Sequence, residues 1–359
     1  MEIKRRKCST VRVGDLVIGG DAPISIQSMT NTDTHDFEAT RAQIVALAAA
    51  GCDVVRLTVP DMEAVGVLAR LKNEALGVPL VADIHFDHRL AVAAAEVGVD
   101  KIRINPGNIG DEASVRDVVN ACHRHAVPIR IGVNGGSLEN HNLAKHGAPT
   151  PEALSESALY HVSLLEKYDS HDIVISIKAS DVPTMIGAVR LLADRCTYPL
   201  HLGVTEAGAG ESARAKSAIG IGSLLVDGIG DTVRVSLTSD PVEEIAAAKS
   251  ILRAIGAAGH TGLNIVSCPT CGRTKINLID LVARFEAAAK KEGLMDMPLR
   301  VALMGCAVNG PGEAREADIG ICGGKGEALL IKRGEIVEKI KEDQVIDCLI
   351  AEIKKIKEG

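Results

Sequence analysis

The 359-residue sequence contains very few aromatic side chains: no tryptophan, three tyrosines and three phenylalanines, which together make up 2% of the chain. Its core must therefore be built from alanine, valine, isoleucine and leucine. Proteins that bind single-stranded nucleic acids stack the bases on aromatic side chains, so this composition excludes that class. Hydrophobic residues make up 46% of the chain and charged residues 24%, as in an ordinary globular protein.

A basic surface is also missing, because the net charge is −7 and the isoelectric point is about 5.9. Nucleic-acid-binding domains usually carry a basic stripe. The one dense basic run, residues 4–7, is expected to be a solvated tail. No apolar segment of the signal-peptide kind follows it, and no stretch of 18 uncharged apolar residues predicts a membrane span. We therefore expect neither nucleic acid nor a membrane as a partner.

The number of cysteines is odd, which argues against a framework of disulfide bonds. The nine are Cys8, Cys52, Cys122, Cys196, Cys268, Cys271, Cys306, Cys322 and Cys348. A chain of this length without an export signal fits the reducing cytoplasm, where clustered cysteines serve metal binding or catalysis.

Eight short β-branched runs, each with polar residues toward its end, predict eight strands. They cover residues 24–30, 54–60, 80–86, 101–108, 129–136, 173–180, 200–208 and 231–238. Stretches of helical period, such as 37–51 and 88–98, lie between them. Eight βα units in succession predict a (β/α)8 TIM-type barrel over residues 1–258; an open doubly wound sheet is the alternative.

The strand period of two places a cation on the polar face of five of these runs. These cations are Arg56, Arg103, Arg130, Lys178 and Arg234. Each could pair with a carboxylate from the set Asp53, Asp83, Asp100, Glu206 and Asp231. However, the carboxylates on the same faces are too few for all five cations. Since arginine suits phosphate and barrel active sites lie at the carboxyl ends of the strands, we favour an anionic, phosphorylated ligand.

Further polar residues follow the same strands and could orient substrate hydroxyls or move protons. They are Asp83, His85, Asn105, Asn134, Glu206 and Ser236.

Residues 259–359 predict a smaller α+β domain. We expect an apolar strand that leads into Cys268, further strands at 299–306 and at about 317–322, 327–332 and 335–339, helices at 278–293 and about 343–357, and a glycine-rich loop at 307–314.

The motif Cys268-Pro-Thr-Cys271-Gly is half of a zinc knuckle, but no second Cys-x-x-Cys follows at the spacing that a zinc ribbon needs. Cys306 stands alone instead. Three thiolates would suit a [4Fe–4S] cluster with one iron differently ligated. The fourth ligand is either Cys322 or Glu313, and a carboxylate would be the exchangeable one.

Taken together, these motifs resemble those of the 4-hydroxy-3-methylbut-2-enyl diphosphate synthases, iron–sulfur enzymes of the non-mevalonate isoprenoid pathway. The stretches that carry the resemblance are "VVRLTVP", "ADIHF", "KIRINPGN", "RIGVNGGSL", "SIKAS", "GVTEAG", "VRVSLT", "CPTCGR" and "GCAVNGPGEA". They span both predicted domains. Thr261 departs from the family pattern, in which an arginine is common, and this puts only a peripheral contact in doubt.

The resemblance implies a cytoplasmic homodimer in which the cluster domain of one subunit caps the barrel of the other. It implies that 2-C-methyl-D-erythritol 2,4-cyclodiphosphate is reduced through the cluster, with flavodoxin or ferredoxin as electron donor. It also implies roles for particular residues. The diphosphate would bind to Arg56, Arg103, Arg130, Lys178 and Arg234, assisted by Asn134, Ser236 and Asn309. Asp83, His85 and Glu206 would line the pocket, and Cys268, Cys271, Cys306 and Glu313 would hold the cluster.

Two other functions fit parts of the pattern. One is a zinc-stabilised barrel that binds phosphosugars without redox chemistry. The other is an aldolase in which Lys178 forms a Schiff base.

Overall fold

The computed structural model describes residues 3–105, 107–260, 262–308 and 310–358. The chain divides into two compact units, Met1–Gly259 and His260–Gly359. No helix in the described ranges is both long and apolar enough to cross a membrane.

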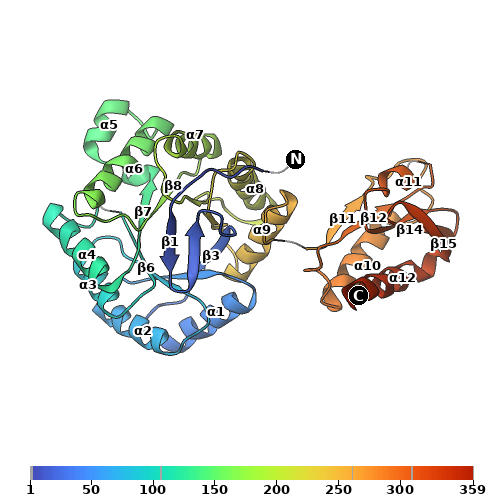
Figure 1. Cartoon of the computed structure of the whole chain (residues 1–359), viewed down its shortest axis with the longest axis horizontal. Coiled ribbons are helices and arrows are strands. Elements are labelled where there is room, and N and C mark those ends of the chain that lie inside the picture. Colours follow the sequence, from blue (N-terminus) through green and yellow to red (C-terminus); the bar gives the residue numbers. More distant parts are fainter. Residues whose placement is uncertain (1–2, 106, 261, 309, 359) are drawn as a thin grey trace. The chain divides into compact units, whose positions relative to one another are not determined.

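A ring of eight parallel strands forms the centre of the first unit (Figure 1). The strands are β3 (Ser25–Met29), β4 (Val54–Thr58), β5 (Leu80–Asp83), β6 (Lys101–Ile104), β7 (Ile129–Asn134), β8 (Ile173–Lys178), β9 (His201–Leu202) and β10 (Thr232–Val233). They pair in the order β8-β7-β6-β5-β4-β3-β10-β9. A parallel bridge between Ile175 and Leu200 joins the two ends of this order. The predicted TIM-type barrel is confirmed, and the doubly wound alternative is wrong.

Helices alternate with the strands and surround the ring (Figure 1). They are α1 (Phe37–Ala49), α2 (Met62–Asn73), α3 (His88–Glu96), α4 (Glu112–His125), α6 (Pro151–Glu166), α7 (Val182–Ala193), α8 (Gly210–Val226) and α9 (Pro241–Ala254). A short turn η1 (Gly135–Ser137) and helix α5 (Asn140–His146) lie between β7 and α6. Many of these helices begin at an aspartate that accepts a hydrogen bond from a first-turn N–H, as Asp36 does for α1 and Asp61 for α2. Such caps fix where each βα connection ends.

Alternation along the strands separates the core from the barrel interior. On β6, Ile102 and Ile104 belong to the aliphatic core shared with the helices, whereas Lys101 and Arg103 occupy the alternate positions. The other strands repeat this pattern. As a result, polar side chains gather inside the ring.

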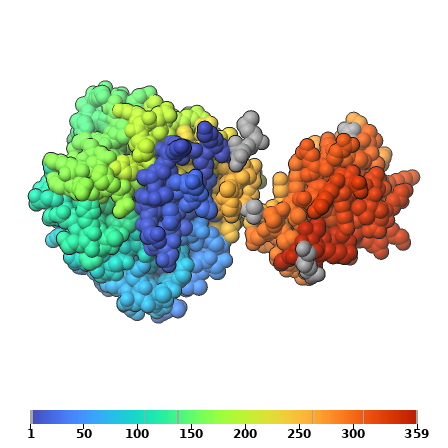
Figure 2. Space-filling view, in the orientation of Figure 1, coloured from blue at the N-terminus to red at the C-terminus, as the bar shows by residue number. Residues whose placement is uncertain are grey.

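An N-terminal hairpin, which the sequence analysis did not predict, packs against the barrel. Strands β1 (Thr10–Val13) and β2 (Leu16–Gly19) pair antiparallel. The side chains of Val11, Val13 and Ile18 are buried in a cluster with Val174. Figure 2 shows this dark blue segment lying on the surface of the barrel unit.

The basic run that precedes the hairpin is not a solvated tail, so that prediction was wrong. Arg5 donates to Asp231 at 2.8 Å, and Arg6 donates to the carbonyl oxygens of Cys196 and Tyr198, each at 2.6 Å. These half-buried guanidinium groups fasten the N-terminal segment to loops that precede the strands.

The second unit is a five-stranded mixed sheet with two long helices. Its strands are β11 (Asn264–Ser267), β12 (Arg300–Met304), β13 (Ile319–Gly323), β14 (Glu327–Lys332) and β15 (Glu335–Lys341), paired in that order. The first three run parallel and the last two pairings are antiparallel. Helices α10 (Leu278–Lys291) and α12 (Val345–Glu358) contribute Phe285 and Leu349 to the core under the sheet. A short turn η2 (Glu342–Gln344) precedes α12.

One expectation for this unit needs a correction. The predicted loop at 307–314 contains a helical turn, α11 (Gly310–Glu313). Gly310 packs so closely on β13 that a Cβ atom would lie 2.6 Å from Sγ of Cys322. The turn therefore depends on the absence of a side chain at that position.

Candidate active site

A cavity of about 140 Å³ lies at the carboxyl ends of the barrel strands. Its lining contains all five cations predicted from the strand period: Arg56, Arg103, Arg130, Lys178 and Arg234. It also contains four other predicted residues: Asp83, His85, Asn134 and Ser236. Gly132, Ser176 and Thr205 complete it; the sequence analysis did not single out these three as site residues.

Strand register explains why these side chains converge. Arg103 on β6 is paired with Arg130 on β7, and Asn134 on β7 with Lys178 on β8. Gly132 leaves room for this crowding, because a Cβ atom there would lie 2.5 Å from Nε of Arg103. Neighbouring parallel strands therefore deliver these side chains to one cavity.

Among the described residues that line the cavity, Asp83 is the one carboxylate. Its Oδ1 accepts a hydrogen bond from Nη1 of Arg103 at 3.1 Å, and its Oδ2 lies 3.6 Å from Nε of Arg56. Burial opposes ionisation of this carboxyl, but Arg56 and Arg103 hold its pKa down to about 2. Nη1 of Arg103 also lies 3.2 Å from Nε2 of His85. Asp83 is therefore ionised at neutral pH and shared between two arginines.

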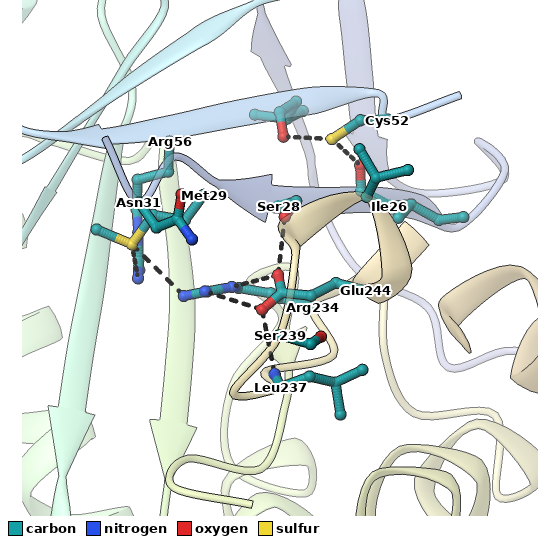
Figure 3. Close-up of polar contacts among 12 residues, drawn as sticks. Ile26, Ser28, Met29, Asn31, Cys52, Arg56, Arg234, Leu237, Ser239 and Glu244 are labelled. Carbon is teal, nitrogen blue, oxygen red and sulfur yellow. Dashed lines mark hydrogen bonds and ion pairs between the residues drawn. The ribbon is translucent and has the colours of Figure 1, made fainter. Parts of the chain in front are cut away.

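Arg234 has a carboxylate partner outside the cavity lining, Glu244 on α9 (Figure 3). Nε and Nη2 of Arg234 each lie 3.3 Å from one carboxylate oxygen. The hydroxyl of Ser28 donates to the same carboxylate at 2.7 Å, and the backbone N–H of Leu237 at 3.2 Å. Glu244 is 3% exposed. Sequence reasoning missed it, although a glutamate at an inner position of the helix after the last strand was a usable signal.

A methionine sulfur separates two of the arginines (Figure 3). Sδ of Met29 lies 2.9 Å from Nη2 of Arg56 and 3.5 Å from Nη1 of Arg234. A thioether is a weak acceptor without charge, so it spaces the guanidinium groups without neutralising either.

The cavity carries a large excess of positive charge. Five cations face Asp83, with Glu244 behind Arg234. Arg130 is 1% exposed, and its Nε and Nη1 have no hydrogen-bond partner among the described residues. Burial, reinforced by Arg56 and Arg103, lowers the pKa of Arg130 well below its usual value. Burial, reinforced by Arg234, does the same for Lys178. An anion in the cavity would relieve both effects.

The other carboxylates named above as possible partners of these cations lie elsewhere. Asp53 accepts from the N–H of Ile26, Asp100 pairs with Lys72 at 2.6 Å, and Asp231 pairs with Arg5. All three serve the opposite end of the barrel.

Three predicted site residues do not appear in this lining. Asn105 is buried and accepts a hydrogen bond from the N–H of Gly107 at 3.1 Å. Glu206 is exposed, in a left-handed backbone conformation with φ of 53°, and lies next to Thr205, which does line the cavity. Asn309 lies outside the described residues, as does Thr261.

A second cavity, of about 190 Å³, lies in the small unit and gathers the predicted thiols. Its lining includes Cys268, Cys271, Cys306 and Glu313. The N–H of Gly305 donates to Sγ of Cys268 at 3.3 Å, a contact of the kind that tunes metal-bound thiolates.

This donor set fits a cluster better than a single ion. No three Cys, His, Asp or Glu side chains in the described ranges stand close enough to hold one metal ion. A four-iron cluster binds each thiolate through a separate iron, so its ligands line the wall of a cavity instead of meeting at a point. The zinc alternative gains no support from this arrangement.

Cys322, the rival fourth ligand, lies behind the cavity wall. It is fully buried on β13 with Met304, Ala314 and Ile331. Burial raises the pKa of its thiol to about 12. Of the two candidates, only Glu313 belongs to the cavity lining.

A (β/α)8 barrel with a cationic cavity, joined to a mixed-sheet domain with a thiol-lined cavity, defines a class of two-unit barrel enzymes. Residues 8–249 match the family model described as the GcpE TIM-barrel domain, and residues 264–355 match the GcpE protein C-terminal domain. The chain belongs to the GcpE family, and the resemblance seen in its motifs is confirmed.

Curated relatives align over nearly the whole chain. A protein of Ruminiclostridium cellulolyticum is 54% identical over 99% of both chains, and one of Geobacter sulfurreducens is 55% identical over 98% of both. Both are named 4-hydroxy-3-methylbut-2-en-1-yl diphosphate synthase (flavodoxin). The chain is therefore an oxidoreductase of this family.

Solved structures of other enzymes share only the barrel. A type I 3-dehydroquinate dehydratase from Clostridium difficile matches 69% of this chain and 98% of its own, with a TM-score of 0.51 and 14% identity. An N-acetylneuraminic acid synthetase from Leptospira borgpetersenii matches 71% of this chain and 93% of its own, with a TM-score of 0.50 and 12% identity. These likenesses show the fold alone.

Proposed function

We propose that the chain reduces 2-C-methyl-D-erythritol 2,4-cyclodiphosphate to 4-hydroxy-3-methylbut-2-enyl diphosphate. The reaction takes up two electrons and two protons and releases one water. The observation that carries this proposal is the excess of buried cations in the barrel cavity. It is supported by the full-length relatives that bear the name of this activity.

The cations bind the diphosphate in this proposal. Arg56, Arg103, Arg130, Lys178 and Arg234 surround it, and Asn134 and Ser236 add neutral hydrogen bonds. Hydrogen bonds to charged groups contribute about 1.5–3 kcal/mol each, and arginine can bind phosphate oxygens bidentately. These donors are already held in place, so they stabilise the charge that shifts between the phosphates as the ring opens.

Protons and hydroxyl groups are handled by the remaining cavity residues. Because Asp83 is ionised at neutral pH, it accepts hydrogen bonds from substrate hydroxyls and does not supply protons. His85, which contacts the same guanidinium group, moves a proton. Glu206 and Glu313 are the carboxyl groups that we assign as proton donors from outside the cationic cavity.

A [4Fe–4S] cluster would be held by Cys268, Cys271 and Cys306, with Glu313 as the exchangeable fourth ligand. Bound there, the cluster supplies electron transfer and Lewis acidity. We assign Asn309 to the substrate-facing side of this site, as the family resemblance implies.

The electron donor is a flavodoxin, as in the names of the relatives, or a ferredoxin, and the enzyme works as a homodimer in the cytoplasm. The structure contains no disulfide bond within its described ranges, which suits a reducing compartment. Light scattering on the purified protein measures the oligomeric state.

Anaerobic turnover of the cyclic diphosphate with a chemical reductant tests the function. We expect the acyclic diphosphate as product, and a brown protein with about four irons per chain. A colourless protein that binds zinc and gives no product would refute the proposal. Trapping of Lys178 by borohydride with a carbonyl substrate would favour the aldolase instead.

A further inference from the structure

A second set of polar side chains lies inside the barrel, one step below the cationic cavity. Lys101 precedes Arg103 by two residues on β6, so both face the lumen. Gln27, His201 and Thr232 hold the corresponding positions on β3, β9 and β10. All four are between 0% and 1% exposed. None of the four lines the cavity.

The amine of Lys101 has no hydrogen-bond partner among the residues that the structure describes. The same holds for both ring nitrogens of His201 and for the side-chain amide of Gln27. Polar groups buried in this way are costly unless something satisfies them.

The charges that face Lys101 are nearly all positive. Arg103 lies above it on β6, Arg56 on β4, Arg130 on β7, Lys178 on β8 and Arg234 on β10, and the imidazole of His201 on β9 faces the same interior. The exception is Asp83 on β5, which is already shared by Arg56 and Arg103. Behind Arg234, Glu244 on α9 is occupied by that arginine.

An ammonium group at this point would be a buried cation beside two guanidinium groups and without a counterion. Burial of such an ion without a partner is strongly unfavourable, and a lysine relieves the penalty by releasing its proton. Burial, reinforced by Arg130 and Arg56, accordingly lowers the pKa of Lys101 well below the usual value. Arg130 cannot respond in this way, because guanidinium groups stay protonated in proteins.

A diphosphate in the cavity makes the electrostatic potential at this amine less positive. It places two negative charges among the guanidinium groups that otherwise repel a proton from Nζ. An opposite charge nearby favours the charged form of an amine.

We propose that Lys101 is an uncharged amine in the ligand-free barrel and takes up a proton when a diphosphate fills the cavity above it. Lys101 is thus a positioning residue that adds a positive charge below the cavity only when the anion is present. This inference rests on the proposed function, since it takes the diphosphate as the ligand. It also explains how the empty barrel tolerates a lysine at its centre.

Calorimetric titration tests the proposal with the holoenzyme and the cyclic diphosphate in the absence of reductant. Each phosphorus of this ligand carries one strongly acidic hydroxyl, so the ligand does not titrate near neutral pH. Titrations at pH 7.5 in two non-phosphate buffers of different ionisation enthalpy give the number of protons taken up.

The variants to compare are Lys101→Met, which keeps the length of the side chain, and Lys216→Met on the exposed face of α8 as control. We expect Lys101→Met to take up about one proton fewer than the wild type. The affinity of the wild type should fall by up to about tenfold per pH unit as the pH rises through the window of proton uptake. The curve for Lys101→Met should be flatter, and Lys216→Met should match the wild type.

Equal proton uptake by wild type and Lys101→Met would overturn the inference. Loss of uptake in His201→Gln alone would assign the proton to the imidazole and overturn it as well. The thermal midpoint of ligand-free Lys101→Met should equal or exceed that of the wild type, since an unpartnered amine is removed; a large drop would mean that the amine is charged and paired. Failure of the wild type to bind the cyclic diphosphate would refute the proposed function instead.

Discussion

The two cavities differ in both charge and exposure. In the barrel cavity, Arg130 is 1% exposed and Arg103 6%, and hydrogen bonds to Asp83 and His85 hold the latter in place. In the thiol cavity, Cys271 and Glu313 are exposed and the cysteines lie on loops at the ends of strands. One cavity is lined by buried cations, whereas the other is more exposed and contains three thiols.

The difference reflects what each cavity has to bind. Anion binding requires donors that are desolvated and fixed before the ligand arrives, so repulsion among cations is built into the ligand-free barrel. Holding a metal cluster requires deprotonated soft ligands at suitable positions. The ligands then become ordered when the cluster binds. Substitutions in the two cavities should therefore have different effects. Changes at the thiols should abolish turnover, and changes at the cations should weaken binding of the cyclic diphosphate.

The largest effect should follow from Cys306→Ser. Loss of one of three thiolates should remove the cluster and reduce turnover by at least about 10³-fold, while the barrel still binds the cyclic diphosphate within about twofold. Iron content, absorbance near 400 nm and calorimetry measure these properties. Cys122→Ser, a buried helical cysteine in the barrel, is the control and should retain its iron. Loss of substrate binding in Cys306→Ser would show that the two cavities are not separable.

The next largest effect should come from Glu313→Ala. Three thiolates should still hold the iron, but turnover should fall by about 10²-fold or more because the exchangeable ligand and its carboxyl group are gone. Cys322→Ala is the matched variant: we expect it to keep both iron and turnover, apart from the loss of stability that a cavity in the core causes. A fully active Glu313→Ala together with an iron-free Cys322→Ala would reverse the assignment of the fourth ligand.

Arg130→Met should weaken binding of the cyclic diphosphate by about 10–100-fold, because a charge-assisted hydrogen bond to the ligand is lost. Its stability should change little or rise, since a buried guanidinium with two unpartnered nitrogens is replaced by an apolar side chain. Calorimetry and thermal unfolding measure the two quantities. Arg116→Met, on the exposed face of α4, is the control. Weaker binding with an equal loss of stability would mean that Arg130 holds the barrel together instead.

Much of this arrangement could be predicted from the sequence because it is periodic or local. The strand period of two put Arg103 and Arg130 on inward faces, and the strand register then paired them. The spacing of Cys268 and Cys271 fits two ligands on one loop. Each of these signals lies within a few residues and needs no knowledge of distant partners.

The features that were missed depend on contacts between distant parts of the chain. Glu244 pairs with Ser28, more than 200 residues away. Arg5 and Arg6 bind residues that come late in the sequence of the barrel, Asp231 and Cys196. A run of basic residues has the same local pattern whether it is solvated or bound to the barrel. Its partners are therefore visible only in the folded structure. Glu206 shows the converse: its place after a strand predicted a lining residue, but a left-handed turn leaves it exposed.

Asp83→Asn should remove the contribution of this carboxylate to the pH dependence of stability. The folded pKa of about 2 lies below the usual value near 3.9. The ionised carboxylate therefore stabilises the fold above pH 4, and this contribution is lost as the pH falls toward 2. It amounts to about 2–3 kcal/mol, which Asp83→Asn should lose at pH 7 but not at pH 2. Urea unfolding at both pH values measures it, and exposed Asp117→Asn is the control. A difference that persists at pH 2 would point to lost packing.

The smallest effect should come from Glu244→Gln, which tests whether the cationic cavity depends on a partner outside its lining. The amide keeps the shape of the carboxylate and can still accept from Ser28, but it no longer carries the charge that orients Arg234 (Figure 3). We expect binding of the cyclic diphosphate to weaken by about 3–10-fold, because Arg234 must then be ordered by the ligand itself. Ser28→Ala is the matched control: it removes one hydrogen bond to the carboxylate and leaves the ion pair, so its affinity should change by less than about twofold. Equal losses in the two variants would show that the hydrogen-bond network, and not the charge of Glu244, holds Arg234 toward the substrate.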